Sequence, residues 1–159
     1  MIYIAQELLP NGDLYDYLTP IRASGEHAIR LFARQIIQGM KHMKDHGYTH
    51  RDIKLENICL DSNFTPKIID WGFAKRYEPG DQTQTLLGTP VYMAPEILNR
   101  QNYDPHKADM FALGVLLFAI KKNNYPWVQA TQNDQSFRMI MQDQHDDFWT
   151  IHQQGLSDS

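Results

Sequence analysis

The chain has 159 residues, of which 42% are hydrophobic and 21% are charged, values typical of one soluble globular unit with its own core. Its net charge of −4, without a long basic run, argues against nucleic acid or an anionic membrane as a main partner. The single cysteine, Cys59, excludes an internal disulfide framework and favours a reducing compartment, the cytosol or the nucleus.

The amino-terminal part predicts little regular structure. Residues 2–4 predict the end of a strand, residues 8–12 an exposed connection, and residues 13–18 a short helix. The start of the chain has neither the basic region nor the apolar run of a signal peptide. The longest apolar run, residues 110–120, is too short to span a bilayer and predicts a buried helix.

A long amphipathic helix is predicted over residues 26–46. Its apolar side chains recur at helical spacing, at Ile29, Phe32, Ile36, Met40 and Met43. Gly47 follows in the usual place of a carboxy-terminal cap. Two short strands, 58–60 and 67–69, come next, separated by a turn-forming segment that ends at Pro66.

The second half of the chain predicts helices. Asp104 before Pro105 marks the boundary that precedes the buried helix, and a surface helix is expected around residues 135–142. The sequence shows no internal repeat and no linker, so we expect no domain boundary within it.

The segment from His50 to Asn57 carries the clearest chemistry. Asp52 can accept a proton from a hydroxyl group, Lys54 can neutralise phosphate charge, and Asn57 can offer an amide oxygen to a magnesium ion. We expect His50 to pack and hydrogen-bond inside the fold and not to act as a base. This set of residues is the one needed to move a phosphoryl group.

The two predicted strands also suggest a metal site. Asn57 precedes the first strand and Asp70 follows the second, so antiparallel pairing would return Asp70 close to Asn57. An amide and a carboxylate oxygen suit a hard cation that keeps phosphate and water as its other ligands. The alternative is a capped hairpin with solvated ends. The seven histidines show no spacing typical of a zinc site, and none is expected.

Three motifs in this order resemble the eukaryotic protein kinases of the serine/threonine type: His50–Asn57, then Asp70-Trp71-Gly72, then the run 88–96 with the sequence GTPVYMAPE. The resemblance implies a mainly α fold with short β-hairpins, the large carboxy-terminal lobe of the α+β kinase fold. Residues 1–159 would form a partial kinase domain, from the hinge to the helix after the activation segment, without the small lobe and the final helices. Trp71 stands where phenylalanine is usual, as it does in active casein-kinase-like enzymes.

The resemblance also assigns roles to individual residues. Asp52 is similar to the catalytic base and Lys54 to the group that contacts the transferring phosphoryl. Asn57 and Asp70 match the magnesium ligands, which also places them at the ATP site. Thr89 matches the threonine that hydrogen-bonds the base and the lysine.

The resemblance continues into the hinge, where ATP is expected to bind. Gln6 aligns with the gatekeeper, and Glu7 and Leu9 align with the backbone positions that contact adenine. Asp13 falls where an acid contacts the ribose or a basic substrate side chain. Cys59 falls on the apolar floor under adenine, and a small buried hydrophobe is a compatible interpretation.

Substrate choice follows from the same resemblance. Glu56, which we group with the ATP-binding residues, and Asp13 could together bind a basic residue upstream of the target serine or threonine. The apolar residues Leu86, Pro90 and Met93 would favour an apolar residue just after that target. This pattern is similar to calcium/calmodulin-dependent-like or related basophilic kinases.

Regulation is suggested by the threonine-rich loop before Thr89. Arg51, beside the expected base, would pair with a phosphate on Thr85 or, as the poorer match, Thr83. The alternative is a loop whose threonines are never modified.

The sequence contains no glycine-rich phosphate loop, no strand lysine in a Val-Ala-Ile-Lys-like context and no helix glutamate to pair with it. ATP would lose much of its positioning without them, so we expect the 159 residues alone to be a very poor kinase. The sequence favours a piece of a serine/threonine kinase that uses ATP and Mg²⁺ on protein substrates. The alternative is a non-catalytic kinase-like binding module. The oligomeric state is left open.

Overall fold

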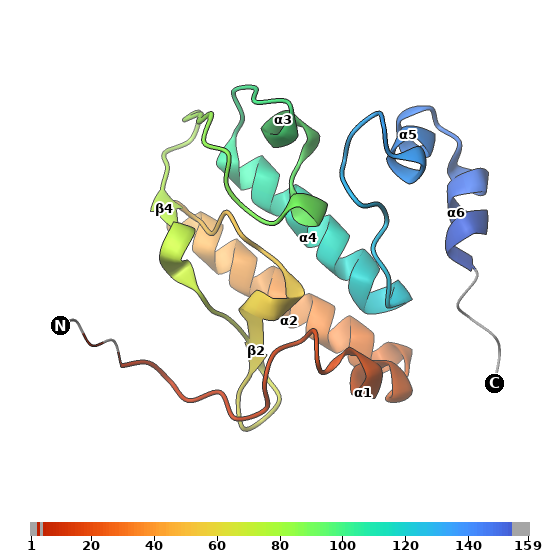
Figure 1. Ribbon diagram of the computed structural model, residues 1–159. Coiled ribbons are helices and arrows are strands. Elements are labelled where there is room, and N and C mark those ends of the chain that lie inside the picture. The colour runs from red at the N-terminus through yellow and green to blue at the C-terminus, as the bar shows by residue number, and fades with distance from the viewer. Residues whose placement is uncertain (1–2, 4, 154–159) are drawn as a thin grey trace.

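A computed structural model describes residue 3 and residues 5–153 of the chain. The helices and strands follow one another in chain order (Figure 1): α1 Leu18–Ala23, α2 Glu26–Asp45, β1 Tyr48–Thr49, β2 Ile58–Leu60, β3 Pro66–Ile68, β4 Lys75–Arg76, α3 Pro95–Leu98, α4 Pro105–Lys122, α5 Gln135–Met141 and α6 His145–Gln153. The strand end predicted at residues 2–4 falls on residues 2 and 4, which lie outside the described part. None of the described helices is long and apolar enough to cross a membrane.

Two long helices, α2 and α4, lie side by side and form the centre of the fold (Figure 1). Helix α2 confirms the predicted amphipathic helix: its buried side chains are Phe32, Ile36, Met40 and Met43. Gly47, which follows the helix, has a φ of 75°, a left-handed conformation that glycine adopts without strain.

Helix α4 confirms the predicted buried helix and its boundary. The Asp104 carboxylate accepts hydrogen bonds from the backbone N–H groups of His106 and Lys107, so it caps the helix at its amino-terminal end. The helix ends where Asn123 takes a left-handed conformation with a φ of 54°. Most of its faces carry buried side chains, as expected for a helix in the middle of a domain.

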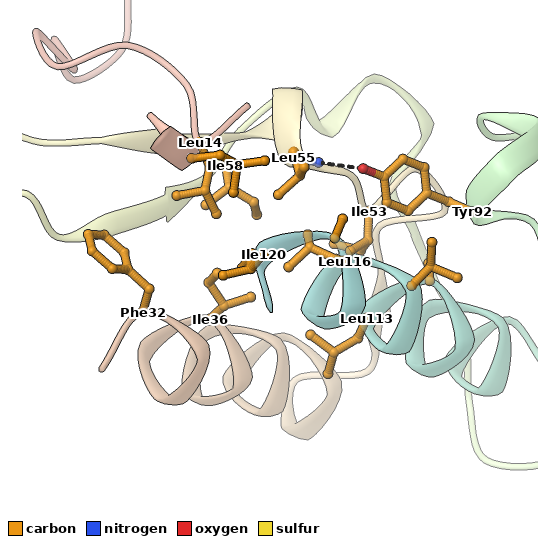
Figure 2. Packing of buried hydrophobic residues seen from close by; sticks show 14 of the residues in the cluster. Leu14, Phe32, Ile36, Ile53, Leu55, Ile58, Tyr92, Leu113, Leu116 and Ile120 are labelled. Carbon is orange, nitrogen blue, oxygen red and sulfur yellow. Dashed lines mark hydrogen bonds between the residues drawn. The ribbon is translucent and has the colours of Figure 1, made fainter. Parts of the chain in front are cut away.

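The main core joins these helices to the segments around residues 52–60 (Figure 2). Leu14, Ile53, Ile58, Leu116 and Ile120 all have exposed fractions of 0%. These five come from the first connection, the segment before β2, β2 itself and α4. Their burial fixes the segment that carries Asp52, Lys54 and Asn57 against the two long helices.

Two short antiparallel strand pairs lie beside these helices, and only the first is a hairpin of consecutive strands. Strands β2 and β3 pair with Ile58 opposite Ile68, which confirms the predicted hairpin, although β3 begins one residue earlier than expected, at Pro66. Strands β1 and β4 pair with Tyr48 opposite Arg76.

The helix predicted over residues 13–18 is wrong, because helix α1 begins only at Leu18. Asp13 forms a β-bridge with Cys59, and the N–H of Leu14 donates to the carbonyl of Ile58 at 2.7 Å. These bonds hold residues 13 and 14 against β2, so the helix starts only where the chain leaves the hairpin. The predicted surface helix is confirmed as α5.

Candidate active site

Asp52 lies at the centre of a hydrogen-bonded cluster and is only 8% exposed. Its Oδ1 accepts from the hydroxyl of Thr89 at 2.9 Å, and its Oδ2 lies 2.8 Å from the Lys54 ammonium. The Asn57 amide donates to the same Oδ2 at 3.2 Å and to the Asp52 carbonyl at 2.8 Å. Lys54 also donates to the Thr89 hydroxyl at 3.1 Å, which closes the cluster.

The Asp52 carboxylate can accept one more hydrogen bond. A carboxylate offers about four lone-pair positions, and Thr89, Lys54 and Asn57 occupy three of them. The remaining position can accept a hydrogen bond from an incoming hydroxyl group. The cluster therefore has the arrangement of a positioned base beside a cation.

Buried Asp109 of helix α4 holds the backbone just before this cluster. Its carboxylate accepts the N–H of His50 at 2.7 Å and the N–H of Arg51 at 2.9 Å. Arg51 has a φ of 67°, a left-handed conformation that is uncommon for a residue with a side chain. Burial raises the pKa of Asp109, and the two backbone donors oppose that rise.

His50 packs inside the fold, as the sequence predicts. Its exposed fraction is 0%, its Nε2 lies 2.8 Å from the Ile69 carbonyl, and its Nδ1 accepts from the N–H of Asp52 at 3.3 Å. Because a carbonyl can only accept, Nε2 carries the proton. Both ring nitrogens are thus engaged, and His50 ties the segment before Asp52 to the end of β3.

Asn57 and Asp70 are brought together by the hairpin. The N–H of Ile69, the residue before Asp70, donates to the carbonyl of Asn57 at 2.9 Å. The Asn57 amide nitrogen is fixed on Asp52, which leaves its side-chain oxygen as the free acceptor end. The Asp70 carboxylate is exposed, and its Oδ1 accepts from the N–H of Gly72 at 3.3 Å.

These two oxygen donors fit a magnesium ion, which is bound by one or two protein oxygens together with phosphate and water. No group of three or more His, Cys, Asp or Glu side chains in the described residues could hold a metal by itself.

A groove of about 840 Å³ lies between the amino-terminal segment, helix α2 and the β2–β3 hairpin. Its wall includes Gln6, Glu7, Leu9 and Asp70 from the predicted nucleotide residues. Its volume is in the range of small-molecule sites. The groove therefore joins the predicted adenine residues to one of the two metal-ligand candidates.

Comparison with known proteins identifies the family. The protein kinase domain model matches residues 1–157. This chain belongs to the eukaryotic protein kinase family. Its relatives include the mouse serine/threonine-protein kinase SIK1, 36% identical over 80% of this chain, and the human NUAK family SNF1-like kinase 1, 40% identical over 79%. The probable serine/threonine-protein kinase MARK-C of Dictyostelium discoideum is 35% identical over 87% of this chain.

The aligned part covers only 16%, 19% and 18% of the length of those three kinases, respectively. The match of the family model establishes the family and its fold for this chain, and it confirms the resemblance that the three motifs predicted. In kinase terms, the described structure corresponds to the large lobe. By the resemblance given above, the catalytic loop would lie at Asp52 and the activation segment would run from Asp70 to Glu96, and these two names are used for those segments below.

Several predicted residues of the kinase site lie outside the wall of the groove. Cys59 is half-buried, and burial, followed by the charge of Asp13, raises the pKa of its thiol. The Asp13 carboxylate accepts from the N–H of Asp16 at 3.0 Å. Glu56 is exposed beside the catalytic loop. Asn57 faces Asp52 and is not part of the groove wall.

Residues 83–88 of the activation segment contact other parts of the fold at Gly88 and around Thr83 and Thr85. Gly88 approaches the catalytic loop so closely that an added Cβ would lie 3.1 Å from the Arg51 carbonyl oxygen. Thr83 pairs with Tyr103 as a β-bridge, and the Tyr103 hydroxyl donates to the carbonyl of Thr85 at 2.7 Å. The Thr83 and Thr85 hydroxyls lie 2.8 Å apart.

The Arg51 side chain donates hydrogen bonds to two residues within the same lobe. Its Nε donates to the carbonyl of Phe73 at 2.6 Å, and its Nη1 donates to the Tyr77 hydroxyl at 3.3 Å. Pairing with a phosphate on Thr83 or Thr85 stays a prediction.

Sequence reasoning missed two residues that support the catalytic loop. Asp109 lies in α4 directly before the apolar run 110–120, and an acid beside that run was the available signal. Tyr92 accepts the N–H of Leu55 on its hydroxyl at 3.3 Å and donates to the Tyr125 hydroxyl at 3.2 Å. No local pattern reveals those contacts, since the partners lie 37 and 33 residues away.

Proposed function

We propose that this chain supplies the catalytic residues for transfer of the γ-phosphoryl group of ATP to serine or threonine hydroxyls of proteins. The observation that carries the proposal is the Asp52 carboxylate, held at 2.8 Å from Lys54 and 2.9 Å from Thr89 with one acceptor position free. Two of the relatives, SIK1 and MARK-C, are serine/threonine-protein kinases by name, which supports the same acceptor.

In the proposed reaction, the substrate hydroxyl donates its hydrogen bond to Asp52. The hydroxyl oxygen forms a bond to the γ-phosphorus, the bond from that phosphorus to the β–γ bridging oxygen breaks, and ADP leaves. Asp52 takes the hydroxyl proton, and Lys54 neutralises charge on the transferring phosphoryl. Thr89 holds both side chains in place through its hydroxyl.

Asn57 and Asp70 would hold magnesium, which neutralises charge on the nucleotide phosphates when it is bound. The amide of Asn57 has a second duty, since it orients Asp52 through the bonds at 2.8 and 3.2 Å. A change at Asn57 would therefore disturb the base as well as the metal.

Substrates with a basic residue upstream of the target fit the acidic side chains beside the catalytic loop. Glu56 is exposed, and neither it nor Asp13 takes part in an ion pair within the described residues. Both carboxylates are thus available to a basic substrate side chain. A peptide series with arginine or alanine at each upstream position would measure this preference.

A chimera would test the function directly. The amino-terminal part of the kinase domain of human NUAK family SNF1-like kinase 1 is joined ahead of this chain, so that the ATP-positioning elements are present. We expect Mg²⁺-dependent phosphorylation of a serine peptide and a fall in kcat of about 10²- to 10⁴-fold in Asp52→Asn, the contribution of a positioned base. Glu26→Gln, an exposed change at the start of α2, is the matched control and should leave kcat unchanged.

A chimera in which Asp52→Asn is as active as the wild type would contradict the proposal. A chimera that binds ATP and transfers no phosphate in either form would favour the binding-module alternative.

A further inference from the structure

A histidine pair lies at the carboxy-terminal end of α2, outside the catalytic cluster. His42 and His46 are one helical turn apart, and their ring centroids lie 4.2 Å from each other with an interplanar angle of 42°. Both side chains are exposed. It is the only pair of histidine rings in contact within the described residues, which include all seven histidines.

One of the two rings is already oriented by a hydrogen bond. The Nδ1 of His46 lies 2.8 Å from the His42 carbonyl oxygen. Because the carbonyl can only accept, Nδ1 carries the proton in the neutral ring and Nε2 keeps its lone pair. Metal-binding histidines commonly donate their second nitrogen to a carbonyl in this way, which fixes the tautomer that binds the metal.

We propose that His42 and His46 form a two-ligand site for a late first-row divalent ion, of the class of Zn²⁺, Ni²⁺ or Cu²⁺. Side chains at positions i and i+4 lie on the same helix face, so both imidazoles can reach one ion. Imidazole suits these ions, whereas Mg²⁺ prefers oxygen ligands. The pair is therefore chemically distinct from the proposed magnesium ligands.

The other ligands of this ion would be water or groups from outside the pair. Asp45 lies between the two histidines in sequence, but its carboxylate already accepts a hydrogen bond from Lys41. His42 also lines the 840 Å³ groove, so one side of the site faces open space. An exchangeable ion with open coordination positions follows from this arrangement.

A bound ion would stiffen the last turn of α2. That turn leads through Gly47 and β1 into the catalytic loop, which begins at His50. The two imidazoles can share one ion only while the turn is helical. The ion would therefore favour the folded helix over the unfolded chain and raise the thermal stability of the protein.

Titration of the metal-free 159-residue chain with ZnCl₂ in a calorimeter tests the proposal. The variants are His42→Ala and His46→Ala, and the matched control is His27→Ala, an exposed histidine at the other end of the same helix. We expect one Zn²⁺ per wild-type chain and a loss of affinity of at least about tenfold in each of the two variants, with no change in the control.

Two further readouts separate this site from adventitious binding. ZnCl₂ should raise the melting temperature of the wild type and of His27→Ala. It should leave the melting temperatures of His42→Ala and His46→Ala unchanged. Cu²⁺ bound to the wild type should show two nitrogen ligands by electron paramagnetic resonance, falling to one in each site variant. Equal Zn²⁺ affinity in all four proteins, or no binding to the wild type, would overturn the proposal. Circular dichroism checks that the variants remain helical.

Discussion

Replacing Asp109 by asparagine should destabilise the protein much more than one isosteric substitution usually does. The carboxylate accepts two backbone N–H groups, at 2.7 and 2.9 Å, and its side chain is only 4% exposed. Asparagine offers one oxygen and one NH₂ group, so one buried backbone donor would face another donor. Losing a hydrogen bond to a charged acceptor costs about 1.5–3 kcal/mol, and leaving a donor buried without a partner costs about 1–3 kcal/mol.

These two costs overlap, and removing a buried charge returns part of them. Burial raises the pKa of Asp109, because the ionised carboxylate is less stable in the buried site than in water. We therefore expect a net loss of about 2–3 kcal/mol in the free energy of unfolding. Urea denaturation followed by circular dichroism would measure it.

Asp104→Asn is the matched control for this experiment, because Asp104 caps the same helix and asparagine caps equally well. Its free energy of unfolding should stay within about 0.5 kcal/mol of the wild type. An Asp109→Asn variant as stable as that control would refute the reasoning.

Three further perturbations follow from the structure. Tyr92→Phe should lower the free energy of unfolding in urea by about 1–3 kcal/mol, because the buried N–H of Leu55 loses its acceptor; a loss below about 0.5 kcal/mol would contradict this. Leu116→Ala should cost about 2–5 kcal/mol in the same assay, because its side chain is 0% exposed, whereas Met110→Ala, 53% exposed, should cost far less. Hydrogen bonds from the backbone of its own turn lower the pKa of Asp61 below its ordinary value of 3.8. Asp61 therefore stabilises the fold above that value, and this stability is lost as the pH falls through the lowered pKa. Between pH 7 and pH 2.5, the wild type should lose more stability than Asp61→Asn, and parallel curves would contradict the assignment.

The elements that could be predicted from the sequence are those whose signals are local. The apolar stripe of α2 depends only on spacing along one helix, and the boundary at Asp104 and Pro105 depends on cap chemistry next to the helix. The hairpin β2–β3 could also be predicted, because two short β-rich segments flank a turn. Each of these predictions is confirmed.

The failures come from contacts distant in sequence. The helix predicted at residues 13–18 does not form there because a hydrogen bond between Leu14 and Ile58, 44 positions apart, holds the chain against β2. Asp109 acts on Arg51 from 58 residues away. Neither partner can be identified from composition or periodicity near either residue.

The candidate site shows the same division. The motif around Asp52 predicts which residue types meet, and the structure places Lys54, Asn57 and Thr89 on its carboxylate. The histidine pair is different: the sequence analysis found no zinc-site spacing among the histidines, and only the structure shows that the rings of His42 and His46 touch and that His46 is oriented by a carbonyl.

The most direct test of the central claim is a rapid-quench measurement of the phosphoryl-transfer step in the chimera, with ATP affinity measured in parallel. If Asp52 is the base, Asp52→Asn slows that step by about 10²- to 10⁴-fold and leaves the affinity for Mg²⁺·ATP close to that of the wild type. An unchanged transfer step in Asp52→Asn would contradict the claim. So would a slower step explained entirely by weaker nucleotide binding.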